Sequence, residues 1–124
     1  MTEKHLTDTR FDSFGLSEDI MKGVTDAGFE NCTPIQAATL PVALDGRDVA
    51  GQAQTGTGKT AAFLLATLHM LESEPASEQR RPNQPRALMV APTRELAIQI
   101  HKDATVLARH TPYKVEVVYG GAGY

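Results

Sequence analysis

The stretch Ala53-Gln54-Thr55-Gly56-Thr57-Gly58-Lys59-Thr60 decides the fold of this chain. Its glycines and small residues let the backbone curl, so that successive N–H groups point toward one spot where an anion can bind. Lys59 adds a positive charge there, and the Thr60 hydroxyl is a suitable ligand for Mg²⁺. The apolar segment 61–71 follows at once, so the loop opens a helix whose positive end faces the same anion. This stretch, called here the phosphate loop (53–60), predicts a site for nucleotide phosphates.

One position departs from the usual pattern of such loops, because the first residue is Ala53 and not glycine. A glycine turn with a purely structural role is the alternative interpretation. Phosphate binding is favoured because a predicted strand precedes the loop and a predicted helix follows it, which is the context that the mechanism needs.

The composition is that of an ordinary soluble globular protein with one small domain. The 124 residues include no apolar run of membrane-spanning length, and the polar start 1–10 lacks the apolar core of a signal peptide. The lone Cys32 excludes an internal disulfide and agrees with a reducing compartment. We therefore expect a cytoplasmic protein with no membrane partner.

The net charge of −3 excludes binding of polyanions through overall charge, so nucleic acid would have to bind at a local site. The four histidines have no metal-ligand spacing with one another or with Cys32, so we assign them no metal.

Helix signals and strand signals alternate along the chain. After a tail at 1–10, helices are predicted after the Ser17 cap, after Thr33-Pro34 with an end or kink before Pro41, over 58–71, and from Pro92 to about His110. Strands are predicted at 49–52, at 86–91 as a buried strand, and at 114–119. Such alternation predicts an α/β fold built on a parallel sheet with helical crossovers.

A glutamine and an aromatic residue upstream of the phosphate loop suggest a pocket for adenine. The amide of Gln36 offers one donor and one acceptor side by side, which matches the N6/N7 edge of adenine. The ring of Phe11 supplies a stacking face. Each residue also has a plainer explanation, Gln36 as a solvated helix residue and Phe11 as a core anchor.

A second cluster, Pro92-Thr93-Arg94-Glu95-Leu96-Ala97, lies at the junction of a predicted strand and a predicted helix. Ligands bind at the carboxyl ends of the strands in open parallel sheets. A helix N-terminus that carries Thr93 and Arg94 suits a phosphodiester backbone. The alternative is a capped helix in which Arg94 pairs with a nearby acid.

Four motifs, taken in order, resemble those of the DEAD-box ATP-dependent RNA helicases: 28–36 with Phe11 upstream, the phosphate loop, 92–97 and Gly120-Gly121. The resemblance runs from Phe11 to the last residue. An alanine at the head of the phosphate loop is normal for this family.

Three segments are similar to one bacterial subgroup of the family, namely 31–36, 46–52 and 83–86. Cys32 stands where the wider family commonly has proline, but it is similar to this subgroup. The subgroup is associated with the RNA-degrading assembly built on ribonuclease E. The ribonuclease E degradosome is therefore an expected partner, through C-terminal regions that the chain lacks.

The resemblance implies an α/β fold that is an incomplete RecA-like (P-loop NTPase) parallel sheet flanked by helices, the first helicase domain only. Residues 11–124 would form its N-terminal part, after a flexible tail at 1–10. In the family, the strands between 49–52 and 86–91 come from sequence after Tyr124, so unpaired strand edges and exposed apolar faces are expected.

No Asp-Glu-Ala-Asp occurs in the chain, and the second RecA-like domain with its arginine finger is missing from it. An arginine finger alone contributes on the order of 10³–10⁵ in rate. We therefore expect negligible ATP hydrolysis from this chain by itself, although the full protein would be an ATP-dependent RNA helicase.

The resemblance also implies a role for each motif residue. ATP and Mg²⁺ would be bound by Phe11, Thr33, Gln36, Ala53, Gln54, Thr55, Gly56, Thr57, Gly58, Lys59 and Thr60. Phe11 would stack on adenine, and Thr33 would support the pocket in which Gln36 reads the adenine edge. The two catalytic residues would be Lys59, on the β- and γ-phosphates, and Thr60, on Mg²⁺. The RNA sugar-phosphate backbone would be held, without reading of bases, by Pro92, Thr93, Arg94, Gly120 and Gly121.

Two other classes of protein stay open. The first is another P-loop protein, such as a kinase or a transport ATPase, which need not prefer ATP through Gln36. The second is a non-enzymatic nucleotide-binding or interaction module that ends at Tyr124. A soluble chain that unfolds cooperatively would support the second class.

Overall fold

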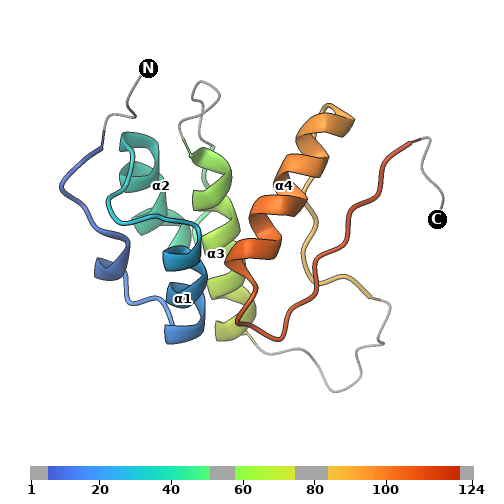
Figure 1. Ribbon diagram of the computed structural model, residues 1–124. Coiled ribbons are helices and arrows are strands. Elements are labelled where there is room, and N and C mark those ends of the chain that lie inside the picture. The colour runs from blue at the N-terminus through green and yellow to red at the C-terminus, as the bar shows by residue number, and fades with distance from the viewer. Residues whose placement is uncertain (1–5, 51–57, 75–83, 121–124) are drawn as a thin grey trace.

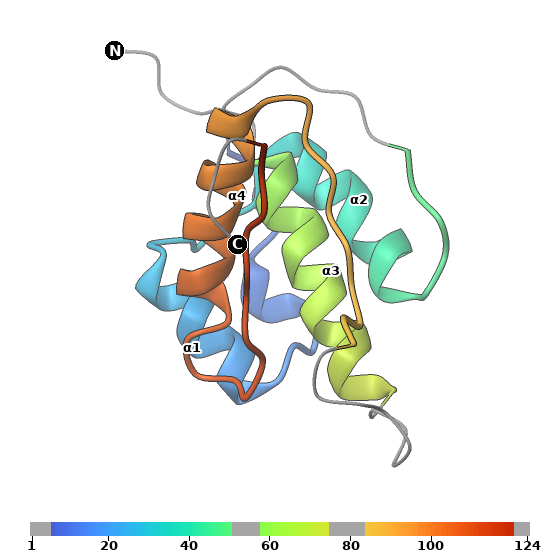
Figure 2. The same cartoon turned by 90° about the vertical axis from the view of Figure 1, so that its right-hand side faces the viewer.

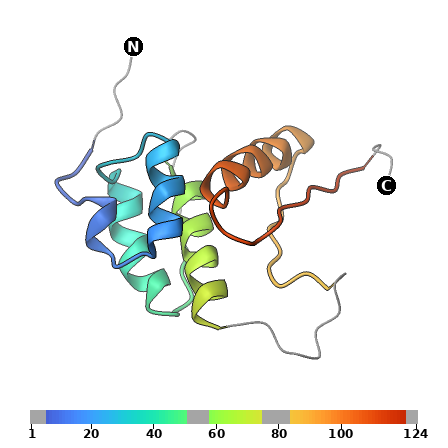
Figure 3. The ribbon, with the colours of Figure 1, turned by 60° about the horizontal axis from the view of Figure 1, so that its bottom comes forward.

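The computed structural model describes residues 6–50, 58–74 and 84–120 (Figure 1). These residues form a short 3₁₀ helix and four α-helices: η1 (Phe11–Ser13), α1 (Glu18–Asp26), α2 (Pro34–Leu44), α3 (Lys59–Ser73) and α4 (Arg94–Leu107). α2 packs on α3, and α4 packs on both α1 and α3. α1, α2 and α3 gather on one side of the molecule, and α4 lies on the other with two extended segments, 84–93 and 111–120 (Figure 3). None of the described helices is long and apolar enough to span a lipid bilayer.

Side-chain caps set the starts of three helices. The hydroxyl of Ser17 accepts a hydrogen bond from the Ile20 N–H at 3.2 Å, which satisfies one of the free amides at the start of α1. The same hydroxyl donates to the carboxylate of Glu72 at 2.9 Å, so the cap also joins α1 to the last turn of α3. Thr33 and Thr93 cap α2 and α4 in the same way. The helix starts predicted at these three residues are confirmed.

α2 does not end at its proline. The helix continues through Pro41 to Leu44, although the ring removes one backbone donor from the helix interior. Pro41 is exposed and Leu40, the residue before it, is fully buried. Of the two outcomes predicted before Pro41, an end or a kink, the end is wrong, because the packing of α2 on α3 outweighs the lost hydrogen bond.

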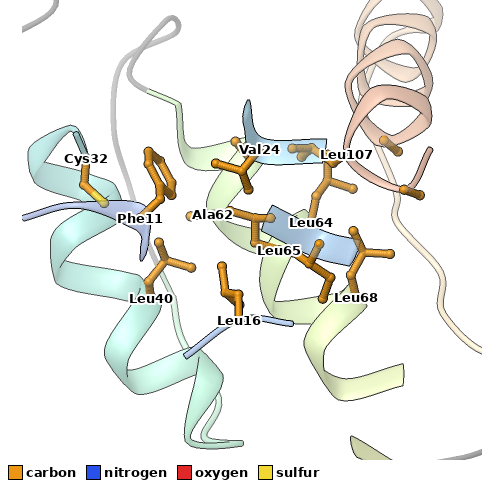
Figure 4. Packing of buried hydrophobic residues seen from close by; sticks show 14 residues of the cluster. Phe11, Leu16, Val24, Cys32, Leu40, Ala62, Leu64, Leu65, Leu68 and Leu107 are labelled. Carbon is orange, nitrogen blue, oxygen red and sulfur yellow. The ribbon is translucent and has the colours of Figure 1, made fainter. Parts of the chain in front are cut away.

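The core lies between the first three helices and the C-terminal end of α4 (Figure 4). Its largest fully buried side chains are Phe11, Ile20, Val24, Cys32, Leu40, Leu65 and Leu107. Burial in this apolar surrounding raises the pKa of the Cys32 thiol to about 11. Cys32 therefore packs as a small hydrophobic residue and stays un-ionised at neutral pH.

α1 and α4 come unusually close at Gly23. A Cβ atom added at this position would lie 2.2 Å from the carbonyl oxygen of Leu107 and 2.8 Å from its carbonyl carbon. Both neighbours are backbone atoms, which cannot rotate away. Only glycine therefore allows α1 to pack against the end of α4 at this distance.

None of the predicted strands is found among the described residues. Residues 49–50, 86–91 and 114–119 have no strand assignment there, and 51–52 lie outside the described part of the chain. The burial predicted for 86–91 is wrong, since Leu88 and Val90 are each 84% exposed. A strand requires a ladder of hydrogen bonds to a neighbouring strand, and neither extended segment forms one within the described residues.

Side chains hold the two extended segments against the helices. Arg86 donates through Nη2 to the carbonyl of Glu74 and, at 3.5 Å, to that of Leu71, so it caps the C-terminal end of α3. His101 on α4 lies 3.3 Å from the Val115 carbonyl through its Nε2. The segments run past α3 and α4 (Figure 2) and line, with these helices, a largely apolar groove of about 280 Å³.

Candidate functional site

The structure describes the last three residues of the phosphate loop. Gly58 is the N-cap of α3 with φ of 84°, and Lys59 and Thr60 are the first two helical residues, both half-buried. Gly58 has no side chain with which to cap the helix, and the amides of a first helical turn give that helix end its affinity for anions. The predicted residues Ala53, Gln54, Thr55, Gly56 and Thr57 lie outside the described part of the chain.

Gln36 connects the start of α2 to the end of the phosphate loop. Its Oε1 accepts a hydrogen bond from the Thr33 N–H at 2.8 Å, and its Nε2 donates to the Gly58 carbonyl at 3.0 Å. The side chain of Gln36 is buried, with 2% of the residue exposed. The interpretation of Gln36 as a solvated helix residue is therefore wrong.

Thr33 and Gln36 form a reciprocal capping box. The Thr33 hydroxyl accepts from the Gln36 N–H at 3.4 Å, while the Gln36 amide oxygen accepts from the Thr33 N–H. A Cβ at Gly58 would lie 2.2 Å from Gln36 Nε2 and 3.6 Å from Thr33 Oγ1. The structure thus brings together three residues that the sequence assigns to nucleotide binding, and the positive φ of Gly58 favours glycine at this position.

Phe11 lies in the core beside a small cavity. It is 1% exposed and stacks on Phe29, with ring centroids 5.5 Å apart and an angle of 21° between the rings. The cavity, of about 190 Å³, is lined by Arg10, Phe11, Asp12, Met21, Thr25, Gly28, Phe29 and Glu30. Phe11 is therefore a core anchor, as the plainer interpretation has it. It also lines the cavity beside η1. Phe29 was missed as a partner of this ring, although it is the aromatic residue that directly follows Gly28.

A second site lies at the N-terminus of α4, where three of the residues assigned to RNA meet. Thr93 caps the helix, its hydroxyl accepting from the Leu96 N–H at 3.1 Å. Arg94 is the first helical residue, and its Nη2 donates to the Gly120 carbonyl at 3.2 Å. Pro92, Thr93, Arg94 and Gly120 are all exposed. Gly121 lies outside the described residues.

The guanidinium of Arg94 also lies over an aromatic ring. Its Cζ is 5.4 Å from the centroid of the Tyr119 ring, a cation–π contact. Within the described residues Arg94 forms no ion pair with an acid, so the alternative of a simple ion pair finds no support there. Sequence reasoning missed Tyr119, for which the only signal was an aromatic residue directly before the Gly120-Gly121 turn.

The two sites share one end of the molecule. The N-termini of α3 and α4 point to the same end in two perpendicular views (Figures 1 and 2). Free amides and the positive ends of both helix dipoles therefore face the same side, an arrangement suited to anionic ligands. This is the edge at which the predicted parallel sheet would bind its ligands.

Comparison with known proteins agrees with this arrangement. The family model of the DEAD/DEAH box helicases matches residues 33–124. The chain is 57% identical over its full length to the ATP-dependent RNA helicase RhlB of Pectobacterium carotovorum, covering 29% of that protein. It is 59% identical to RhlB of Sodalis glossinidius, covering 30% of it. The chain therefore spans less than a third of the length of these curated relatives.

Solved structures of the same class resemble the fold. The RNA helicase Prp28 of Chaetomium thermophilum, bound to ADP, superimposes with a TM-score of 0.81 and 37% identity over 95% of this chain and 28% of its own. The S. cerevisiae dbp5 variant bound to gle1 and IP6 gives a TM-score of 0.71 and 34% identity over 86% of this chain and 26% of its own. Since the family model covers three quarters of the sequence, the chain belongs to the DEAD/DEAH box helicases.

Proposed function

We propose that this chain is the ATP-binding and RNA-backbone-binding beginning of an ATP-dependent RNA helicase, in which ATP binding and hydrolysis drive RNA unwinding. The observation that carries the proposal is the buried Gln36 amide, which ties the α2 capping box to the Gly58 carbonyl at the start of α3. A residue type that recognises adenine is thereby held against a loop suited to phosphates. The high identity to RhlB proteins supports the same function.

The Gln36 amide keeps the hydrogen-bonding capacity that adenine needs. A glutamine amide has two N–H donors and two acceptor lone pairs, and bonds to the described residues use one of each. The second N–H and the second lone pair match the N7 and N6 positions of adenine, whereas the corresponding edge of guanine presents two acceptors. We infer a preference for ATP over GTP, with Phe11 as the aromatic surface beside the base.

Mg²⁺ fits the start of α3 as a companion of the phosphates. Thr60 offers a hydroxyl oxygen, the kind of donor that Mg²⁺ prefers, and the positive charge of Lys59 lies next to it in the sequence. Within the described residues no cluster of acids or histidines could hold a metal without the nucleotide. When bound, Mg²⁺ would be held by Thr60 and would supply the positive charge that neutralises the β- and γ-phosphates during phosphoryl transfer. Lys59 contributes by binding the same phosphate oxygens.

RNA is proposed to bind at the N-terminus of α4. Among the described residues the Thr93 hydroxyl accepts one hydrogen bond and donates none, so its hydrogen can bond to a phosphate oxygen. Arg94 and the exposed Gly120 lie beside it, with Pro92 before the cap, and we assign Gly121 to the same surface. Contacts of these kinds position a sugar-phosphate backbone without reading bases, which suits an enzyme that acts on many sequences.

A RecA-like parallel sheet is part of the proposal. Segments 86–91 and 114–119 are held extended along α3 and α4, with an apolar groove between them and the helices. We propose that both become strands of the first helicase domain in the longer protein. An association with the ribonuclease E degradosome through C-terminal regions, and a cytoplasmic location, belong to the same proposal.

The proposal is tested on the full-length gene product that carries this chain. Lys59→Ala should abolish RNA-stimulated ATP hydrolysis, because the charge on the β- and γ-phosphates is lost, while the circular dichroism spectrum and melting temperature stay unchanged. Competition of ATP and GTP for a fluorescent ADP analogue then measures base preference in the presence of Mg²⁺. Equal affinity for the two nucleotides, or full hydrolysis by the Lys59→Ala protein, would refute the assignment and favour another class of P-loop protein.

A further inference from the structure

Arg94 occupies a position that helix electrostatics disfavour. It is the first residue of α4, where the free N–H groups create a partial positive charge that favours acids and repels cations. Its side chain is exposed, and no acid in the described residues pairs with it. Two groups on the 114–120 segment offset this repulsion, the Gly120 carbonyl at 3.2 Å from Nη2 and the Tyr119 ring at 5.4 Å from Cζ.

The register of the 114–120 segment brings Tyr119 to this place. Burial alternates along it, with Tyr113, Val115, Val117 and Tyr119 half-buried and the residues between them exposed. The contact between His101 and the Val115 carbonyl fixes the same register two helical turns further along α4. A shift by one residue would turn Tyr119 away from the helix, as side chains alternate along an extended chain.

We propose that Tyr119 is a positioning residue for RNA binding, an inference that rests on the proposed role of Arg94. The ring supports one face of the guanidinium, and the Gly120 carbonyl uses one of its five N–H donors. The remaining donors lie in the plane of the group, which is the geometry that a phosphate accepts in a bidentate contact. Tyr119 thus orients Arg94 before RNA arrives, so that less side-chain freedom is lost on binding.

The inference is tested with the full-length protein, a labelled single-stranded RNA of mixed sequence, a non-hydrolysable ATP analogue and Mg²⁺. Fluorescence anisotropy measures the RNA dissociation constant at several salt concentrations. Tyr119→Leu should weaken binding about two- to fivefold, the range for an exposed cation–π contact, while Tyr119→Phe, which keeps the ring, should bind as the parent does. Arg94→Lys should lose about as much as Tyr119→Leu, because an ammonium group has no planar fork, and this variant leaves the Tyr119 ring unaltered.

A double-mutant cycle separates positioning from direct contact. Tyr119→Leu added to Arg94→Ala should cause no further loss, because the ring then has no guanidinium to orient. A further loss, or full affinity in the Tyr119→Leu or Arg94→Lys protein, would overturn the positioning role.

Arg94→Ala alone tests the underlying function separately. It should reduce the slope of the logarithm of the RNA-binding constant against the logarithm of the salt concentration by about one, the value for one lost phosphate contact. Tyr119→Leu should leave this slope unchanged. If Arg94→Ala changes neither affinity nor salt dependence, the RNA-backbone role of the site is refuted. If Arg94→Ala weakens binding but Tyr119→Leu does not, only the role of Tyr119 falls.

Discussion

Gln36→Glu separates the two hydrogen bonds that the Gln36 side chain makes. The substitution keeps an oxygen in the place of Oε1, so the capping box with Thr33 is preserved, since glutamate is as good as glutamine at this position of the box. It replaces the Nε2 donor by a second oxygen, which then faces the Gly58 carbonyl oxygen at about the present 3.0 Å. Two acceptors would thus meet in a buried place.

The size of the effect follows from the burial of the residue. Gln36 is 2% exposed, so the lost bond and the unsatisfied acceptors should cost about 1–3 kcal/mol of folding free energy. Burial and the facing carbonyl raise the pKa of the introduced carboxyl above its value in the unfolded chain, and its protonated form can again donate to Gly58. Stability should therefore be nearly normal below about pH 4 and should fall as the pH rises above that value.

Urea unfolding of the full-length protein at pH 5 and at pH 8 measures this cost, with competition of ATP and GTP at pH 8 as the functional assay. The variant should be less stable at pH 8 than at pH 5 relative to the parent, and its preference for ATP should fall because one adenine donor is lost. Gln99→Glu makes the same chemical change at an exposed position, where it replaces a hydrogen bond to Asp103 by repulsion between two solvated carboxylates, and it should alter stability by no more than about 1 kcal/mol. Unchanged stability and unchanged nucleotide preference in the Gln36→Glu protein would refute the placement of Gln36 against the phosphate loop.

Two further results are expected from the packing. Gly23→Ala should destabilise the fold by about 1–3 kcal/mol, because its Cβ would meet the Leu107 carbonyl at 2.2 Å, and an unchanged melting temperature would show that α1 and α4 do not approach so closely. Cys32, with its pKa raised to about 11 from 9.0, should react with iodoacetamide at pH 8 about 100-fold more slowly in the native protein than in urea, and equal rates would contradict its burial. Because of the same shift, the Cys32 thiol ionises at a lower pH in the unfolded chain than in the folded chain. The free energy of unfolding should therefore fall as the pH rises above about 9.

Local rules in the sequence were sufficient for the starts of the helices. Ser17, Thr33 and Thr93 mark helix starts because a cap bonds an amide two or three residues away, which the sequence displays directly. The start of α3 at Lys59 follows from the same kind of reasoning about the phosphate loop. The continuation of α2 through Pro41 was not predictable in this way, because it depends on packing against α3.

Contacts between distant residues could not be predicted. The bond from Gln36 to Gly58 spans 22 positions, and that from Arg94 to Gly120 spans 26, so no local pattern reveals them. The strand pattern at 86–91 indicated an extended backbone correctly but not its burial, because burial requires neighbours on both faces of a sheet. The family resemblance was confirmed by the family model that matches residues 33–124. The order of motifs along a chain can be read from the sequence without knowledge of how the residues pack.

The capping box at the start of α2 couples two equilibria. The first turn of this helix depends on Gln36, and the same side chain reaches Gly58 of the phosphate loop. A nucleotide that bonds to this amide binds only the conformation in which the first turn of α2 is formed. Nucleotide binding would therefore shift the equilibrium between the formed and the unfolded turn toward the formed turn. Amide hydrogen exchange in the first turn of α2 should therefore slow when ATP is present, even though the turn lies outside the phosphate loop in sequence.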